Sequence, residues 1–214
     1  MSNPAALLLD QLTTWRTSAS YVSPNEQRVA VRHLDAIEEL LNQMDGAGLK
    51  TSLYWKYFGR WGELVCRHPH GWHKDQAKAH FDDTALEHLE HLDDRLKGLV
   101  PELQSGGLDS LREYAAEARD IVDGDSTIDP DLRMHVKQVI AHLNWCIENY
   151  DAVGDFDLQA AVDRLFATMV RATGASQDRP RWIAWLNKVV WPFGKKAAAE
   201  IGVGVVTQLM LGGS

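Results

Sequence analysis

The sequence has few features that carry chemistry in small proteins. It holds two cysteines, Cys66 and Cys146, which stand far apart and form no Cys-x-x-Cys motif. This excludes a disulfide framework and a thiolate metal clip. Each cysteine lies among apolar residues, so the sequence predicts two small buried thiols.

Membrane and export signals are also missing. No uninterrupted run reaches eighteen apolar residues, which argues against a conventional membrane-spanning helix. The N-terminus has no basic region ahead of its short apolar run, so no signal peptide is predicted. The default expectation is a cytoplasmic protein, with peripheral membrane association left open.

Catalytic motifs are absent as well. No segment matches the phosphate loop GxxxxGK[ST], the dinucleotide turn GxGxxG, the nucleophile elbow GxSxG or the zinc motif HExxH. No catalytic residue is therefore assigned, and a non-enzymatic role is favoured over an enzymatic one.

What the sequence does contain is a series of helix signals. Ser23-Pro24-Asn25-Glu26 has the form of a capping box with proline in the first turn, and Asp129-Pro130 opens a long helix. Apolar residues recur at helical spacing and nowhere alternate with period two, so strands are not expected. The sequence predicts an all-α fold, an irregular bundle of about seven or eight helices with an amphipathic C-terminal helical segment.

The loop Ser105-Gly106-Gly107 is the best internal boundary. It divides an N-terminal helical half, residues 1–104, from a C-terminal half, residues 105–175, and a tail follows over residues 176–214. A single continuous bundle of the two halves is an equally good interpretation.

The tail differs in charge from the rest of the chain. From Asp178 to Ser214 it carries five Lys/Arg against two acidic residues, a net charge of +3, whereas the rest carries 17 against 28, a net of −11. The acidic body disfavours nucleic acid as a partner. A cationic, tryptophan-rich segment on such a body is typical of one that contacts an anionic membrane surface, a protein partner or the body itself.

The tail predicts two helices, one over 181–193 and a more apolar one over 197–211. The second has fifteen residues, so it spans roughly 22 Å, short of a bilayer core of roughly 30 Å. Three sets of residues stand out. The expected anchors in a membrane or partner are Trp182, Trp185 and Trp191. The expected contacts with anionic groups are Lys188, Lys195 and Lys196. Small residues four apart, which suit close helix packing, are Gly194, Ala198 and Gly202.

Histidines gather between residues 66 and 91. Imidazole is a natural zinc ligand, so a zinc site is one hypothesis, with the ligands His68, His70, His73, His88 and His91. His88 and His91 are three apart and share one helix face. The spacing matches no defined metal motif, so the default expectation is that the chain has no cofactor.

One stretch resembles a known group of proteins. The sequence IDPDLRMHVKQVIAHLNWCIENYDAVGDFDLQAAVDRLFATMVRA, residues 128–172, followed by the tryptophan-rich tail, is similar to small uncharacterised helical proteins of bacteria. Some of those occur on mobile elements and beside defence genes. The resemblance implies a bacterial or phage-related accessory or effector protein and transfers no active-site residue.

Three functional hypotheses follow. The first is a non-enzymatic interaction or effector protein, in a bacterial defence setting, whose tail associates with a membrane, a protein partner or a second copy. The second is a metal-dependent enzyme built on the histidine-rich region. The third is a structural subunit whose tail completes an oligomer.

Overall fold

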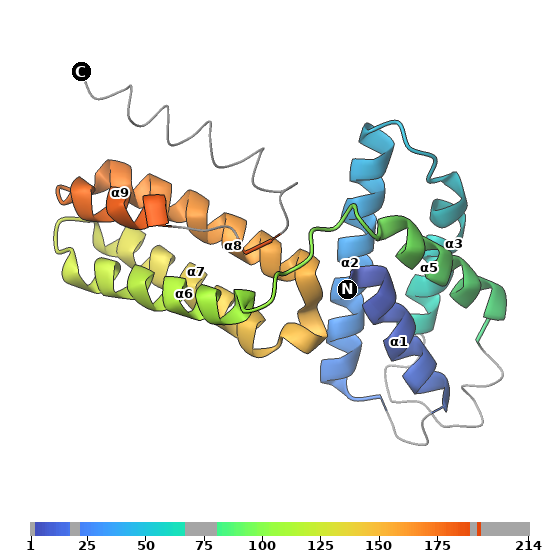
Figure 1. Ribbon diagram of the computed structural model, residues 1–214. Helices are drawn as coiled ribbons and strands as arrows, with labels where there is room; N and C mark the ends of the chain where they lie inside the picture. The colour runs from blue at the N-terminus through green and yellow to red at the C-terminus, as the bar shows by residue number, and fades with distance from the viewer. Residues whose placement is uncertain (1–2, 18–21, 67–80, 189–191, 194–214) are drawn as a thin grey trace. The chain divides into compact units, whose positions relative to one another are not determined.

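The computed structural model describes residues 3–17, 22–66, 81–188 and 192–193, and these residues confirm an all-helical chain (Figure 1). They form eight helices, and no named strand occurs in the described ranges. In chain order the helices are α1 (Pro4–Thr17), α2 (Pro24–Gly46), α3 (Ser52–Cys66), α5 (Asp83–Leu96), α6 (Gly107–Gly124), α7 (Pro130–Glu148), α8 (Tyr150–Ala175) and α9 (Arg179–Lys188).

Two compact units make up the chain. Unit 1 comprises residues 1–100 and 151–156, and unit 2 comprises residues 101–150 and 157–214. The described part of the tail, as far as Phe193, therefore belongs to unit 2. Each unit has its own set of packed helices and is described separately.

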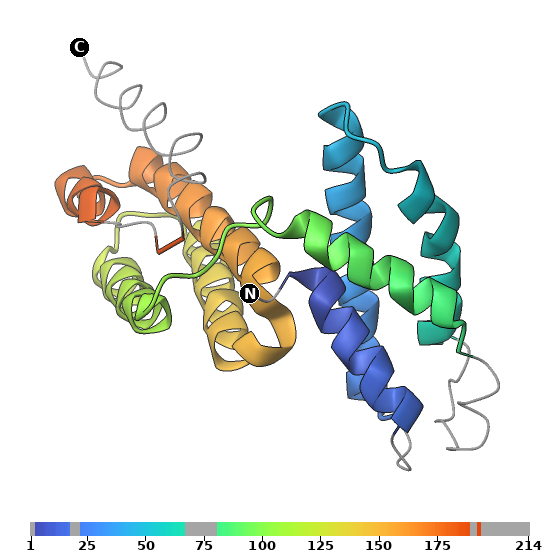
Figure 2. The same cartoon turned by 45° about the vertical axis from the view of Figure 1, so that its right-hand side comes forward.

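Unit 1 is a ring of four helices. α1 packs against α2 and α5, and α3 packs against the same two helices, so each helix has two neighbours (Figure 2). The start of α1 is tied to α5 by Asn3. Its Oδ1 accepts hydrogen bonds from the N–H groups of Ala5 and Ala6, and its Nδ2 donates to Asp93 Oδ1 at 2.7 Å. One side chain thus caps a helix and joins it to another.

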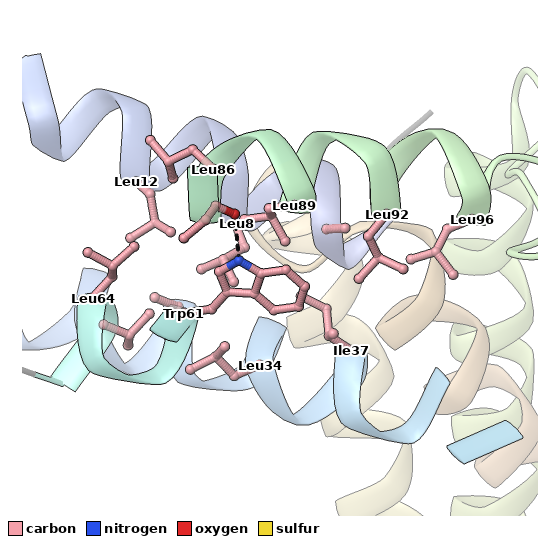
Figure 3. Close-up of a cluster of buried hydrophobic side chains, with 14 of the residues drawn as sticks. Leu8, Leu12, Leu34, Ile37, Trp61, Leu64, Leu86, Leu89, Leu92 and Leu96 are labelled. Carbon is pink, nitrogen blue, oxygen red and sulfur yellow. Dashed lines mark hydrogen bonds between the residues drawn. The ribbon is translucent and has the colours of Figure 1, made fainter. Parts of the chain in front are cut away.

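Trp61 lies at the centre of the unit 1 core. Its side chain is fully buried among leucines of α1 and α5, and its indole N–H donates to the carbonyl of Ala85 at 2.7 Å (Figure 3). A buried indole needs such an acceptor, because its N–H loses hydrogen bonds with water on folding. Trp61 therefore contributes both apolar burial and a fixed link from α3 to α5.

The helix starts predicted from the sequence are confirmed. Ser23 Oγ accepts from the N–H of Glu26, whose carboxylate accepts in turn from the N–H of Ser23 at 2.7 Å. Asp129 caps α7 through hydrogen bonds to first-turn N–H groups. The structure adds a cap of the same kind at Asp82, before α5. Local side-chain chemistry alone sets these boundaries, which is why the sequence is sufficient to locate them.

The prediction of two buried thiols is confirmed for Cys146 and wrong for Cys66. Cys146 is 1% exposed, whereas Cys66 is exposed at the last position of α3. On α3 the buried face is formed by Trp61, Leu64 and Val65. Because each helical residue turns by about 100°, the residue after Val65 points away from that face.

Unit 2 brings four helices around a small apolar cavity. Its lining comes from α6, α7, α8, α9 and the chain after α9. The lining residues are Leu111, Tyr114, Leu143, Val162, Leu165, Phe166, Trp185 and Pro192. α8 has a kink at Gly154, which belongs to unit 1 and has a φ of 72°. A residue with a Cβ atom adopts that backbone conformation only with strain.

His33 is the most unusual titratable group of unit 1. It lies on α2 with 3% of its surface exposed, and its Nδ1 has no hydrogen-bond partner among the described residues. Burial, aided by the charge of Arg32, lowers the pKa of His33 from 6.5 to about 4. The folded unit therefore holds this imidazole neutral at a pH at which the unfolded chain would protonate it.

We expect unit 1 to lose stability between about pH 6.5 and pH 4. The unfolded chain binds a proton at His33 below its unfolded pKa, and the folded chain does not until near its lowered pKa, so acid favours unfolding. Between about pH 7 and pH 5 the loss should be about 2 kcal/mol. The measurement is hydrogen exchange of α2 amides against pH. His33→Leu should reduce the pH dependence, while His91→Leu, which removes an exposed histidine of the same unit, should leave it unchanged; equal slopes in the two variants would contradict the assignment.

Candidate functional site

The described part of the tail forms α9, a ten-residue helix within unit 2. Its apolar residues Trp182, Trp185 and Leu186 are 0%, 4% and 6% exposed, and they form what we term the α9 stripe. The sequence pattern suggested membrane or partner anchors for the two tryptophans. In this structure both indoles pack inside unit 2 instead.

A buried carboxylate holds Trp182 in place. Asp125, between α6 and α7, is 3% exposed, and its Oδ2 accepts from the indole N–H of Trp182 at 2.8 Å and from the hydroxyl of Ser176. Its Oδ1 accepts from the backbone N–H of Thr127 at 2.8 Å and from the Thr127 hydroxyl at 2.6 Å. We call these four residues, Asp125, Thr127, Ser176 and Trp182, the Asp125 cluster.

The electrostatics of the cluster favour the ionised carboxylate. Burial raises the pKa of Asp125, but the hydrogen bonds donated by two hydroxyls, a backbone N–H and an indole outweigh it and hold the pKa well below its usual range. Hydrogen bonds to a charged acceptor are roughly twice as strong as neutral ones. The carboxylate of Asp125 therefore stays ionised in the neutral and mildly acidic range.

The two hydroxyls extend the cluster into the chain that precedes α9. Thr127 Oγ1 accepts from the N–H of Gln177 at 3.0 Å, and Ser176 Oγ accepts from the N–H of Asp178 at 2.9 Å. Each hydroxyl thus donates to Asp125 and accepts from the turn between α8 and α9. The arrangement fixes the direction in which α9 begins.

Trp185 is also buried, but its indole lacks a hydrogen bond like that of Trp182 among the described residues. Its ring contacts Tyr114 of α6 edge to face, with centroids 6.4 Å apart, and it lines the apolar cavity. Its indole N–H is buried and has no hydrogen-bond partner among the described residues. A donor in this state opposes burial, because it has lost its bonds with water.

The cations of α9 lie on its exposed side and have weak partners on unit 2. Lys188 Nζ lies 3.6 Å from Glu117, and Arg181 donates to the carbonyl of Asp120 at 3.3 Å. Arg179 donates to the carbonyl of Gly174 at 3.5 Å. One of these contacts is an ion pair and two are long hydrogen bonds to carbonyls, and an exposed ion pair contributes little stability.

A second attachment follows α9. The N–H of Gln104 donates to the carbonyl of Pro192 at 2.8 Å, and Leu103 pairs with Phe193 in an isolated antiparallel bridge. Phe193 is 2% exposed. The tail is therefore held at both ends of α9 and as far as Phe193.

Several predicted residues lie outside the described part of the chain. They are Trp191, Gly194, Lys195, Lys196, Ala198 and Gly202 of the tail and His68, His70 and His73 of the histidine-rich region. The two remaining histidines are on α5. His88 packs on Tyr57 with ring centroids 4.2 Å apart, and the rings of His88 and His91 are 6.2 Å apart. Within the described ranges, no group of three or more His, Cys, Asp or Glu residues is placed to hold a metal ion.

Comparisons with protein-family models, with curated proteins and with solved structures found no match to this chain. Of the helices that the structure describes, none combines the length and the apolar character that crossing a membrane requires. The functional argument therefore depends on the residues themselves.

Sequence reasoning missed the Asp125 cluster. Asp125-Ser126-Thr127 does carry a local signal, because an aspartate that accepts from the N–H two residues later forms an Asx-turn. The distant members, Ser176 and Trp182, lie 51 and 57 residues further along the chain. No spacing rule links positions so far apart.

We expect Trp182→Phe to destabilise the docking of α9 by about 1.5–3 kcal/mol, the range for a hydrogen bond to a charged acceptor. Trp185→Phe is the matched control, because it makes the same change on the same helix but removes an N–H that has no acceptor among the described residues. It should cost less. The measurement is hydrogen exchange of the α9 amides, and equal losses in both variants would contradict a specific role for the Trp182–Asp125 bond.

Proposed function

We propose that the chain is a non-enzymatic effector protein that associates with anionic membrane surfaces through its C-terminal segment, residues 194–214. The single observation that carries this proposal is the attachment of the tail as far as Phe193. Unit 2 holds the chain up to that residue, so the segment beyond it starts from a fixed point on a folded domain. The resemblance of residues 128–172 to small helical proteins of bacteria, some of which occur on mobile elements, implies an effector role of this kind.

The composition of the C-terminal segment supports membrane association. It carries Lys195 and Lys196 against one acid, Glu200, and is otherwise largely apolar. A lysine near an anionic surface contributes about 1 kcal/mol, and apolar side chains add to this by entering the interface. A short apolar segment with flanking cations is thus better suited to lying on a membrane than to crossing it.

A truncation tests this proposal. We expect the full chain to float with phosphatidylglycerol-containing vesicles and the chain ending at Phe193 to remain unbound, because the truncation removes the lipid-contacting segment. The truncation must end at Phe193 so that unit 2 stays folded. A chain cut after Ser176 would also lose Trp182 and so disrupt unit 2, which would confound the result.

Charge reversal provides the matched control. Lys195→Glu with Lys196→Glu should weaken flotation, while Arg112→Glu with Lys137→Glu, which reverses two exposed cations of α6 and α7, should weaken it less. Equal flotation of the full and truncated chains would overturn the proposal. A truncation that changes only the oligomeric state, with no vesicle binding by either form, would replace it with self-association.

A further inference from the structure

α9 has the composition of a helix that lies on a membrane, although unit 2 buries its apolar side. Its ten residues include three cations, Arg179, Arg181 and Lys188, and no acid, opposite a stripe with two tryptophans. Basic amphipathic helices with tryptophan on the apolar face bind at the level of lipid headgroups. The same side chains that pack into unit 2 are therefore chemically suited to a second environment.

The docked state depends on a few discrete contacts. The Trp182–Asp125 bond holds the start of α9, and the Tyr114 hydroxyl donates to the carbonyl of Lys188 at 3.0 Å near its end. Between them, Trp185 is buried with its N–H unpaired among the described residues. At a membrane interface an indole N–H has water and headgroup acceptors. The N–H of Trp185 would gain there the hydrogen bond that no described residue of unit 2 offers it.

The charges of α9 favour the same exchange of environment. In unit 2 its cations face backbone carbonyls and Glu117 at long distances. An anionic lipid surface would offer each of them a stronger field. Acid is not an equivalent trigger, since the pKa of Asp125 is held far below the mildly acidic range by its hydrogen bonds.

We propose that α9 is a latch: on an anionic membrane it leaves the Asp125 cluster and inserts the α9 stripe of Trp182, Trp185 and Leu186 at the headgroup level. This inference rests on the proposed function, because the C-terminal segment delivers α9 to the surface. A membrane shifts the docked and open populations only by its differential affinity for the two states. The docked state therefore limits membrane binding until lipid competes for the stripe.

A reversible lock tests the latch directly. A Cβ atom added at Gly107 would lie 3.3 Å from the Cβ of Pro192, close to the roughly 3.5–4.5 Å that separates the Cβ atoms of a disulfide. The same added Cβ would lie 2.7 Å from Cδ1 and 2.9 Å from Cγ of Leu103, so the side chain of Leu103 has to be shortened. We therefore choose Gly107→Cys with Pro192→Cys and Leu103→Ala, in a full chain carrying Cys66→Ser to remove the exposed thiol. Oxidation should fix the chain after α9 to the start of α6 and keep the stripe docked.

The lock separates the two proposals. We expect the oxidised chain to retain the vesicle binding that residues 194–214 provide and the reduced chain to bind more tightly. Vesicles of phosphatidylcholine with phosphatidylglycerol are compared with vesicles of phosphatidylcholine alone. Equal binding of oxidised and reduced chains would overturn the latch and leave the proposed function standing, whereas absence of binding in both forms would overturn both.

A substitution that opens the latch provides the converse test. Asp125→Asn keeps the shape of the side chain, but it removes the charge and replaces one acceptor oxygen with an NH2 group that cannot accept. It leaves the α9 stripe untouched. We expect about tenfold tighter vesicle binding, corresponding to the loss of the charge-assisted part of the docking bonds. Asp123→Asn is the matched control, because it changes the net charge equally at an exposed site two residues away. Equal effects of the two variants would show that net charge alone is responsible and would overturn the latch.

Discussion

The arrangement of unit 2 around its tail depends on one buried carboxylate. Each oxygen of Asp125 accepts two hydrogen bonds, from Thr127 at Oδ1 and from Ser176 and Trp182 at Oδ2. A carboxylate offers about four acceptor positions, so these four hydrogen bonds saturate it. The guanidinium of Arg133 donates at 2.7 Å to the backbone carbonyl of Asp125. The charge is stabilised by oriented dipoles, which makes the donors mutually dependent. Removal of any one of them leaves a buried polar group incompletely satisfied.

The direction of the hydroxyl hydrogen bonds explains why the Asp125 cluster also binds backbone groups outside its four residues. Thr127 and Ser176 both donate to Asp125, so their oxygens are free to accept from the N–H groups of Gln177 and Asp178. Donation to a charged group polarises a hydroxyl and strengthens the bond that it accepts. The backbone turn before α9 is thereby ordered by the same charge that holds Trp182, and α9 is fixed in direction as well as in position.

The features that the sequence predicts well are those decided by near neighbours. The all-helical class, the capping box at Ser23 and the cap at Asp129 depend on residues within one turn, and all are confirmed. Cys66 shows the limit of that reasoning, because its apolar sequence neighbours do not determine its side of the helix. The environment of Trp182 is harder still to predict from the sequence, because the helical spacing of tryptophans is the same on a docked helix and on a membrane helix. The difference lies in Asp125, whose proximity only the fold creates.

The two buried tryptophans of α9 therefore have opposite effects on the stability of the docked helix. Trp182 has an acceptor inside unit 2 and gains stability by remaining there, whereas the N–H of Trp185 is buried with no hydrogen-bond partner in the described part of the chain. A helix that served only to complete a core would gain from an acceptor at both positions. Position 185 carries an indole although its surroundings in unit 2 are apolar. An indole is suited to an interface with water on one side and apolar groups on the other. Conflict between local chemistry and the observed packing often marks positions that serve function, and at Trp185 the unmet group is the one that a lipid surface would satisfy.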